Sequence, residues 1–273
     1  MSEIYKHFSI LLAVYEKDDP HLFRKAISSI FLNTYLPREL VIVADGKLTK
    51  SLKDVVAEFS TSNIIKFIQL PVNLGLAKAL NVGLSHINTD FVLRADADDF
   101  NYQNRFELVL SKLDQGFDLV GSAIKEVDKM GREVALRKCP LGEDQIKKFA
   151  RRRNPFNHMS VGFRIAAVQK VGGYPSIYLK EDYALWAAML SNGCKVCNLE
   201  AVLVDASAGK ELFRRRGGMR YAIAEIELQI HLVRCGIKSP ISAFFDGIAR
   251  GLIFLAPGML REIFYLKFLR NYK

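Results

Sequence analysis

The chain has 273 residues, of which 50% are hydrophobic and 25% charged, a composition typical of a globular protein with room for a sizeable core. No apolar run reaches the roughly 18 residues of a membrane-spanning helix, and residues 10–14 are too few for a signal-peptide core, so we expect neither a transmembrane nor a secreted protein. The net charge of +10 indicates an anionic partner, and four cysteines with a single C-x-x-C pair predict reduced thiols and argue against a zinc site.

Apolar runs of strand length alternate with segments of helical period along the first part of the chain. Strands are predicted at residues 8–14, 40–44, 64–70 and 91–95, and helices at residues 19–33, 52–59 and 76–86. This order predicts a mostly parallel sheet with helices on both faces, because parallel neighbours need crossover connections. Ligands of such sheets bind at the carboxyl ends of the strands. We therefore expect a site where these strands end.

Three carboxylates follow the last of these strands. Asp96, Asp98 and Asp99 stand within four residues, and charges this close repel one another unless they share a cation. Mg²⁺ and Mn²⁺ take oxygen ligands, and Mg²⁺ is commonly held by one or two carboxylates plus substrate phosphates. The cluster therefore indicates metal-assisted chemistry on a phosphate-bearing substrate. The alternative is a solvated acidic turn after an edge strand.

Other polar residues fall at the ends of the first two strands. Tyr15 and Glu16 follow the first strand, and Asp45 follows the second, where a carboxylate can accept hydrogen bonds from a base or ribose. Neither a Walker phosphate loop nor G-x-G-x-x-G occurs, which argues against a P-loop ATPase and a dinucleotide-dependent dehydrogenase. Lys78 is a candidate ligand of a diphosphate, with a solvated helix lysine as the alternative.

The second half of the chain supplies a candidate base. A helix is predicted to begin at Glu181-Asp182, and apolar residues stand three, four, seven and eight positions after Asp182. This spacing predicts that Asp182 faces inward and Glu181 points more to the side. Trp186 is either a platform for a sugar ring or part of the core. Residues 126–137 predict a hairpin with its turn at Met130-Gly131.

Five segments together resemble one known family. They are residues 9–15, 39–46, 73–77, 96–99 and 181–186, in family-like order and spacing. The resemblance, over roughly residues 8–205, is to the inverting nucleotide-sugar glycosyltransferases with the GT-A fold (family 2 type), in particular bacterial enzymes of O-antigen and exopolysaccharide assembly. It implies a Rossmann-like, mixed and mostly parallel sheet flanked by helices.

The resemblance also implies roles for individual residues. Tyr15, Glu16 and Asp45 would bind the uridine of a UDP-sugar, and Asp96, Asp98 and Asp99 would bind the ribose and a Mn²⁺ or Mg²⁺ ion on the diphosphate, with the two metal ligands among the three left open. Asp182 would be the catalytic base. Residues 151–160 resemble the family's acceptor-side segment, which makes Asn157 and His158, together with Glu181 and Trp186, candidates for lining the acceptor site.

The function implied is an inverting, metal-dependent transfer of a hexose from a UDP-sugar to a polyprenyl-diphosphate-linked saccharide, giving a β-glycoside at the inner face of the cytoplasmic membrane. One alternative is a nucleotidyltransferase that makes nucleotide sugars, although its usual glycine-rich basic loop near the first strand is missing. The other is a non-catalytic nucleotide-sugar-binding or membrane-scaffold protein, which would tolerate Asp182→Asn. The identity of the sugar and the oligomeric state stay open.

We divide the chain at residue 205. Residues 1–205 form the expected GT-A domain, with a nucleotide-sugar half (1–100) and an acceptor half (101–205). Residues 206–273 form a basic, amphipathic helical tail, since twelve Lys and Arg stand against five Asp and Glu from Ser207 to Lys273. Apolar residues recur at near-helical spacing on both sides of Pro257-Gly258.

This pattern predicts contact with an anionic membrane surface, with packing on the domain as the alternative. No nucleic-acid-binding motif appears. Arg214 to Arg216 are either a mobile loop over a diphosphate or a solvated turn.

Overall fold

The computed structural model describes residues 3–208 and 217–256 of the chain. In this part of the chain, no helix has the length and apolar character needed to cross a membrane. The sequence features at Arg214 to Arg216 and after Pro257 lie outside the described residues.

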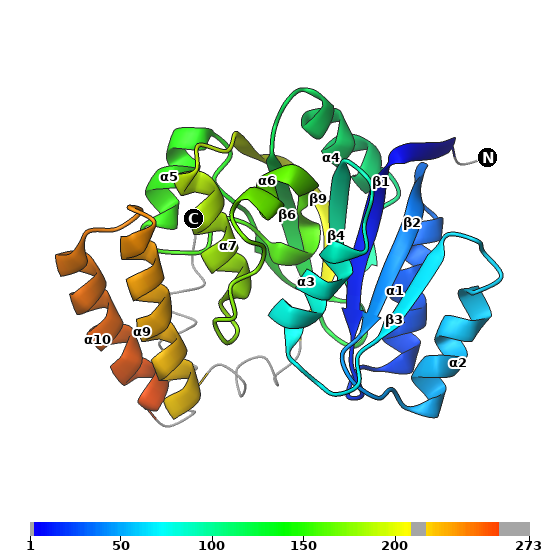
Figure 1. Ribbon diagram of the computed structural model, residues 1–273, viewed down its shortest axis with the longest axis horizontal. Coiled ribbons are helices and arrows are strands. Elements are labelled where there is room, and N and C mark those ends of the chain that lie inside the picture. The colour runs from blue at the N-terminus through cyan, green and yellow to red at the C-terminus, as the bar shows by residue number, and fades with distance from the viewer. Residues whose placement is uncertain (1–2, 209–216, 257–273) are drawn as a thin grey trace.

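The described residues form one nine-stranded sheet, flanked by helices (Figure 1). The strand order is β3-β2-β1-β4-β8-β6-β9-β5, and β7 pairs with β6 off this path. The strands are β1 (Glu3–Val14), β2 (Tyr35–Ala44), β3 (Ile65–Gln69), β4 (Phe91–Asp96), β5 (Phe100–Asn101), β6 (Leu119–Val127), β7 (Glu133–Arg137), β8 (Gly162–Arg164) and β9 (Val196–Ser207).

The sheet is mixed, with a parallel half built from the N-terminal strands. Strand β1 runs parallel to β2 and β4, and β2 runs parallel to β3. The short β8 is antiparallel to both β4 and β6, whereas β6 and β9 are parallel. This confirms the predicted fold class. The hairpin is also confirmed, since β6 and β7 are antiparallel and Gly131 in their turn has φ 75°.

In the described residues, the α-helices are α1 (Pro20–Phe31), α2 (Lys50–Phe59), α3 (Leu76–Ser85), α4 (Arg105–Asp114), α5 (Glu143–Ala150), α6 (Ile165–Lys170), α7 (Glu181–Ser191), α9 (Met219–Arg234) and α10 (Pro240–Leu255). The four helices whose starts were predicted, α1, α2, α3 and α7, begin close to the predicted positions. Asp19 caps α1 by accepting hydrogen bonds from the backbone N–H groups of His21 and Leu22, and Pro20 occupies the first turn. Both features follow the expected start of a helix.

Two hydrophobic cores cover the two faces of the sheet. Along β1, Ile10 and Leu12 pack in the core that contains α1, α2 and α4, whereas Leu11 packs in the core that contains α3, α6 and α7. Successive side chains of a strand point to opposite faces, so a strand buried on both faces is apolar at every position. This is why residues 10–14 are apolar at every position, whereas the buried Ser9 hydrogen-bonds to Glu39 and Thr89.

The C-terminal helices α9 and α10 lie side by side at one end of the molecule (Figure 1). Leu228 and Leu232 of α9 pack on Tyr183, Ala184 and Ala187 of α7. The described part of the tail therefore packs on the domain through one face, which was one of the two alternatives. The other face is exposed.

Candidate functional site

The ends of three parallel strands meet at one edge of the sheet. In the strand register, Val14 of β1 is opposite Ala44 of β2, and Ala13 of β1 is opposite Asp96 of β4. Tyr15, Asp45 and Asp96 therefore follow or end neighbouring strands at nearly the same level. Tyr15 is half-buried and Glu16 is exposed. The structure thus brings together the sequence-predicted residues of the nucleotide half.

Asp45 is held by the loop that precedes α3. Its buried carboxylate accepts hydrogen bonds from the backbone N–H groups of Leu74 (2.7 Å) and Gly75 (2.9 Å). Gly46 makes this approach possible, because a Cβ there would lie 2.8 Å from the Asn73 nitrogen and its φ is +94°. Each oxygen of Asp45 keeps further acceptor capacity for a ligand. Lys78, on α3, is exposed.

The three carboxylates of the acidic cluster differ in solvent exposure. Asp98 is exposed, Asp96 is half-buried and forms an ion pair with the buried Arg94, and Asp99 is buried. One oxygen of Asp99, Oδ1, accepts a hydrogen bond from the Ser207 backbone N–H (2.9 Å) at the end of β9. Burial, and then the charges of Asp98 and Asp96, raise the pKa of Asp99 well above its ordinary value.

Two buried arginines lie behind this cluster, and the sequence analysis missed both. Arg94 lies within β4, and Arg105 at the start of α4 donates a hydrogen bond to the Arg94 carbonyl oxygen (2.6 Å). Burial lowers the pKa of Arg105 to about 9, against the opposing charge of Asp99. A basic residue inside the apolar run of β4 was the available signal, because a buried charge needs a partner. That partner is Asp96.

The cluster fits a divalent cation that a diphosphate would help to hold. Among the described residues, no group of three or more His, Cys, Asp and Glu is arranged to bind a metal alone. However, the Oδ2 atom of Asp99 is buried with no hydrogen-bond partner in the described structure. An unsatisfied buried carboxylate oxygen beside two further carboxylates is suited to a cation that also takes phosphate oxygens as ligands.

Asp182 lies at the start of α7 on the acceptor half. Its Oδ2 accepts a hydrogen bond from the Asn154 side-chain amide (2.6 Å), and its Oδ1 accepts one from the Tyr183 backbone N–H (2.7 Å). These two contacts fix the orientation of the carboxylate. Because Asn154 belongs to the segment at residues 151–160, that segment positions Asp182.

The predicted orientation of the two acidic residues is wrong. Glu181 is buried, and Asp182 is the half-buried one. The argument assumed one apolar stripe, but α7 is buried on nearly all sides, so the spacing of apolar residues does not define an inward face. Burial, and then the charge of Asp182, raise the pKa of Glu181 to about 7.

Trp186 belongs to the core and not to an exposed sugar platform. Its side chain is fully buried, and its ring contacts those of Phe156, His158 and Tyr174. The indole therefore offers no face to a ligand in this structure. Its Nε1–H has no hydrogen-bond partner among the described residues.

Asn157 and His158 are also buried. The Asn157 amide donates hydrogen bonds to the Ser122 and Arg137 carbonyl oxygens, at 2.9 and 3.3 Å, so it holds the chain against β6 and β7. His158 Nε2 lies 3.0 Å from the Tyr174 hydroxyl oxygen. Burial, and then the charge of Arg94, lower the pKa of His158 to about 4, so this imidazole is neutral at pH 7.

The pKa of His158 responds to charges both from the acidic cluster and from α7. The charges of Asp182 and Asp96 both act on this imidazole, each raising its pKa against the larger effects of burial and Arg94. Asp96 of the acidic cluster and Asp182 of α7 therefore both act on the charge of the same buried ring.

Comparisons with known proteins identify the family of this chain. The model of the family described as Glycosyl transferase family 2 matches residues 9–172. Over the full length of both chains, the sequence is 39% identical to the UDP-Gal:alpha-D-GlcNAc-diphosphoundecaprenol beta-1,3-galactosyltransferase of Escherichia coli. It is 37% identical to the amylovoran biosynthesis glycosyltransferase AmsE of Erwinia amylovora, over 93% of each chain.

A solved structure has a similar fold. The crystal structure of residues 1–349 of S. aureus TarS in complex with UDP-GlcNAc matches with a TM-score of 0.70 and 16% sequence identity, over 96% of this chain and 76% of that chain. At this level of identity, the match concerns the fold alone.

Proposed function

The chain belongs to glycosyl transferase family 2, and on that premise we propose that it moves a hexose from a UDP-sugar to a lipid-diphosphate-linked saccharide, with inversion at the anomeric carbon. The single observation that carries this proposal is the 39% identity, from end to end, with a galactosyltransferase whose name specifies alpha-D-GlcNAc-diphosphoundecaprenol as its acceptor. UDP-galactose is accordingly the first donor to test, and a β-1,3 linkage to GlcNAc is the first product to expect. The similarity to AmsE suggests that the product enters a bacterial surface polysaccharide.

In the proposed reaction, Asp182 takes the proton of the acceptor hydroxyl. The acceptor oxygen then attacks the anomeric carbon of the donor, and the bond from that carbon to the diphosphate breaks, so that UDP leaves with the electron pair. Asn154 supports this role, since its amide holds one carboxylate oxygen of Asp182 at 2.6 Å. One displacement inverts the configuration, as it does in the inverting glycosidases.

We assign the donor side to the edge of the parallel strands. Tyr15, Glu16 and Asp45 would bind the uridine, and Lys78 the diphosphate. Asp96, Asp98 and Asp99 would hold a Mn²⁺ or Mg²⁺ ion, which when bound with the diphosphate supplies Lewis-acid stabilisation of the leaving phosphate. The buried, unpartnered oxygen of Asp99 supports this assignment.

A lipid-linked acceptor would also determine where the enzyme works. The saccharide of such an acceptor stays at the membrane surface, because its polyprenyl chain is buried in the bilayer. We therefore propose that the protein acts as a peripheral enzyme at the inner face of the cytoplasmic membrane.

The test is a donor panel with a synthetic GlcNAc-diphosphate-lipid acceptor. UDP-galactose, UDP-glucose and UDP-N-acetylhexosamines are supplied with Mn²⁺, Mg²⁺ or EDTA, and the product linkage is determined by NMR. We expect transfer of one hexose, a β-linked product and loss of transfer in EDTA. Release of pyrophosphate from a sugar phosphate and UTP would instead support a nucleotidyltransferase, and UDP-sugar binding without transfer to any acceptor would support a binding protein.

A further inference from the structure

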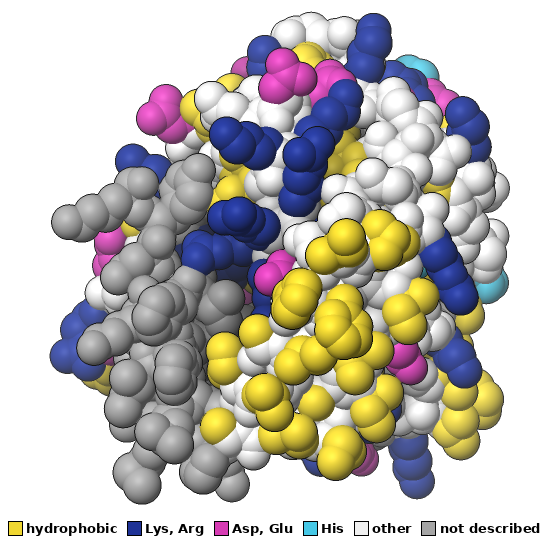
Figure 2. Space-filling view, turned by 90° about the vertical axis from the view of Figure 1, so that its left-hand side faces the viewer, with side chains coloured by type: hydrophobic (Ala, Val, Ile, Leu, Met, Phe, Trp, Pro, Cys, Tyr) yellow, Lys and Arg dark blue, Asp and Glu magenta, His cyan; other side chains and the backbone are white. Residues whose placement is uncertain are grey.

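Helices α9 and α10 carry a continuous apolar surface that faces away from the domain. Of the twenty exposed large hydrophobic residues in the described part of the chain, ten lie on these two helices. They are Met219, Ile223, Ile226, Ile230, Ile241, Phe244, Phe245, Ile248, Leu252 and Leu255. Figure 2 shows hydrophobic side chains gathered over this end of the molecule. We call these ten residues the α9–α10 face.

The α9–α10 face results from two helical stripes. On α9 the exposed apolar residues are three or four positions apart, and α10 repeats the pattern. The opposite side of each helix is already used for packing, with Leu228 of α9 and Ala243 and Gly247 of α10 buried. A surface helix normally pairs an inward apolar stripe with an outward polar face. Here much of the outward face is apolar too, although Arg220, Glu227 and Arg234 of α9 are also exposed.

A basic run lies next to this face. Residues 147–153 contain five Lys and Arg, of which Lys147, Lys148, Arg151 and Arg152 are exposed. The Arg250 guanidinium donates a hydrogen bond to the Arg152 carbonyl oxygen, which places the run beside α10. In Figure 2, Lys and Arg side chains lie along the edge of the apolar patch. Arg152 and Arg250 are 98 residues apart in the sequence, and only the fold brings the basic run and α10 together.

We propose that the α9–α10 face docks in the plane of an anionic lipid bilayer, with the basic run against the lipid head groups. This inference deepens the proposed function and rests on it for the lipid-linked acceptor. An apolar helical face flanked by Lys and Arg binds such an interface through buried apolar area together with attraction to anionic lipids. A second copy of the chain fits less well, because each copy has five Lys and Arg at residues 147–153, whereas the carboxylates of α9 and α10 that could face them are the exposed Glu227 and the half-buried Asp246.

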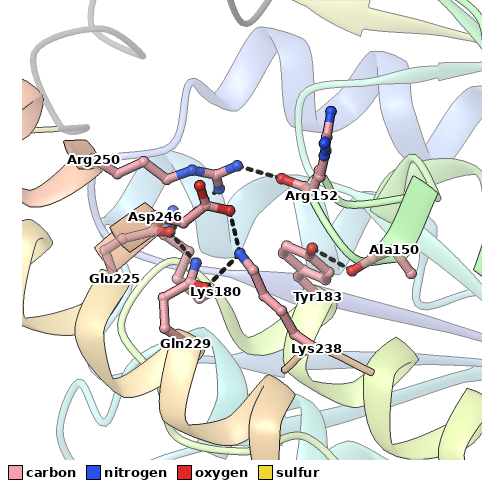
Figure 3. Close-up of polar contacts among 9 residues, drawn as sticks. All are labelled: Ala150, Arg152, Lys180, Tyr183, Glu225, Gln229, Lys238, Asp246 and Arg250. Atoms are coloured by element: carbon pink, nitrogen blue, oxygen red, sulfur yellow. Dashed lines mark hydrogen bonds and ion pairs between the residues drawn. The ribbon is translucent and has the colours of Figure 1, made fainter. Parts of the chain in front are cut away.

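A polar network around the buried Glu225 links α9 and α10 to Lys180 and Arg152 (Figure 3). Glu225 of α9 accepts hydrogen bonds from Lys180 (2.7 Å) and from Arg250 of α10 (3.3 Å). Lys180 immediately precedes the helix that carries Asp182, and Arg250 also holds the Arg152 carbonyl oxygen, two residues before Asn154. Docking of the α9–α10 face would therefore fix the orientation of the proposed acceptor site relative to the bilayer surface.

The test uses the full chain and large unilamellar vesicles, with and without phosphatidylglycerol. Phe245→Glu is compared with Leu32→Glu, since the two side chains are 65% and 60% exposed and Leu32 follows α1, far from α9 and α10. We expect Phe245→Glu to weaken cosedimentation by about tenfold or more, because it replaces a large apolar group with a charge, and Leu32→Glu to leave it unchanged. Arg151→Gln/Arg152→Gln should weaken binding about fivefold for each charge on anionic vesicles only.

Other outcomes overturn the proposal. Equal vesicle binding of Phe245→Glu and wild type, with a lower Tm, means that the α9–α10 face packs against protein. If the wild type is a dimer in analytical ultracentrifugation and Phe245→Glu is a monomer, a second copy of the chain covers the α9–α10 face. Transfer to a short-chain, water-soluble acceptor is measured in the same samples, so loss of vesicle binding with intact transfer separates this inference from the proposed function.

Discussion

At the scale of single residues, a substitution of Asp182 tests the proposed mechanism most directly. Asp182→Asn keeps the size of the side chain and one of its two accepted hydrogen bonds, from Asn154 or from the Tyr183 N–H, but removes the base. We expect kcat to fall by about 10²–10⁴-fold, with the affinity for UDP little changed. Steady-state kinetics and calorimetric UDP binding measure the two quantities, and Asp54→Asn on the exposed face of α2 is the control. If Asp182→Asn is fully active and Glu181→Gln is inactive, the base is Glu181 and not Asp182.

Glu181 makes a separate prediction about stability. Its pKa of about 7 in the folded protein lies above the ordinary value of 4.5, so the folded state binds the proton more tightly than the unfolded state. The stability that this proton contributes is complete below pH 4.5 and is lost as the pH rises through 7. Glu181→Gln cannot ionise and avoids this loss, which corresponds to about 3 kcal/mol.

Thermal unfolding at several pH values tests this stability effect. We expect Glu181→Gln to unfold at a higher Tm than the wild type at pH 8 and at a similar Tm near pH 4.5. A difference in Tm that is the same at both pH values would show that Glu181 does not titrate between them.

At the scale of secondary-structure elements, Glu225 joins α7, α9 and α10. It is fully buried, and although burial alone would raise its pKa, the charges of Lys180 and Arg250 lower it overall. Removing the negative charge would leave two cations without their partner. We expect Glu225→Gln to lower the free energy of unfolding by about 3–5 kcal/mol, measured with urea. Glu227→Gln, two residues away and exposed, is the matched control and should change it little.

This network also predicts an effect on activity. If Glu225 sets the position of α7, kcat of Glu225→Gln should fall under conditions where the variant is fully folded, and Glu225→Asp should recover part of it. A variant with reduced stability but unchanged kcat would limit Glu225 to a structural role.

At the scale of the whole molecule, the basic run and the α9–α10 face predict different salt dependence for two kinds of acceptor. With the acceptor in anionic vesicles, raising NaCl from 0.05 to 0.5 M, about a threefold shorter Debye length, should raise the apparent KM because screening weakens attraction to the head groups. With a water-soluble acceptor, the same change should have little effect. Equal salt dependence for both acceptors would contradict bilayer docking.

Several secondary-structure elements of this protein could be predicted from local sequence patterns. The alternation of apolar runs and helical segments predicted the strands from β1 to β4 and the helices between them, and Asp19-Pro20 predicted the start of α1. Strand β2 nevertheless begins at Tyr35 and not at residue 40, because Pro37 and the charged residues after it interrupt the apolar run. The spacing of the acidic residues indicated their chemistry, since carboxylates that follow a buried strand in a parallel sheet reach the ligand-binding edge.

The sequence by itself therefore determined the order of elements, the edge at which polar residues collect and the family to which the chain belongs. Only the tertiary structure decided that Glu181 is buried and Asp182 half-buried, that Arg94 and Arg105 lie behind the acidic cluster, and that residues 147–153 flank α10. The physical reason is the sequence separation between the residues that interact. Periodicity along the chain records which residues of one element are buried, whereas the partners of a buried charge or of a helix face are set by contacts between segments far apart in the sequence.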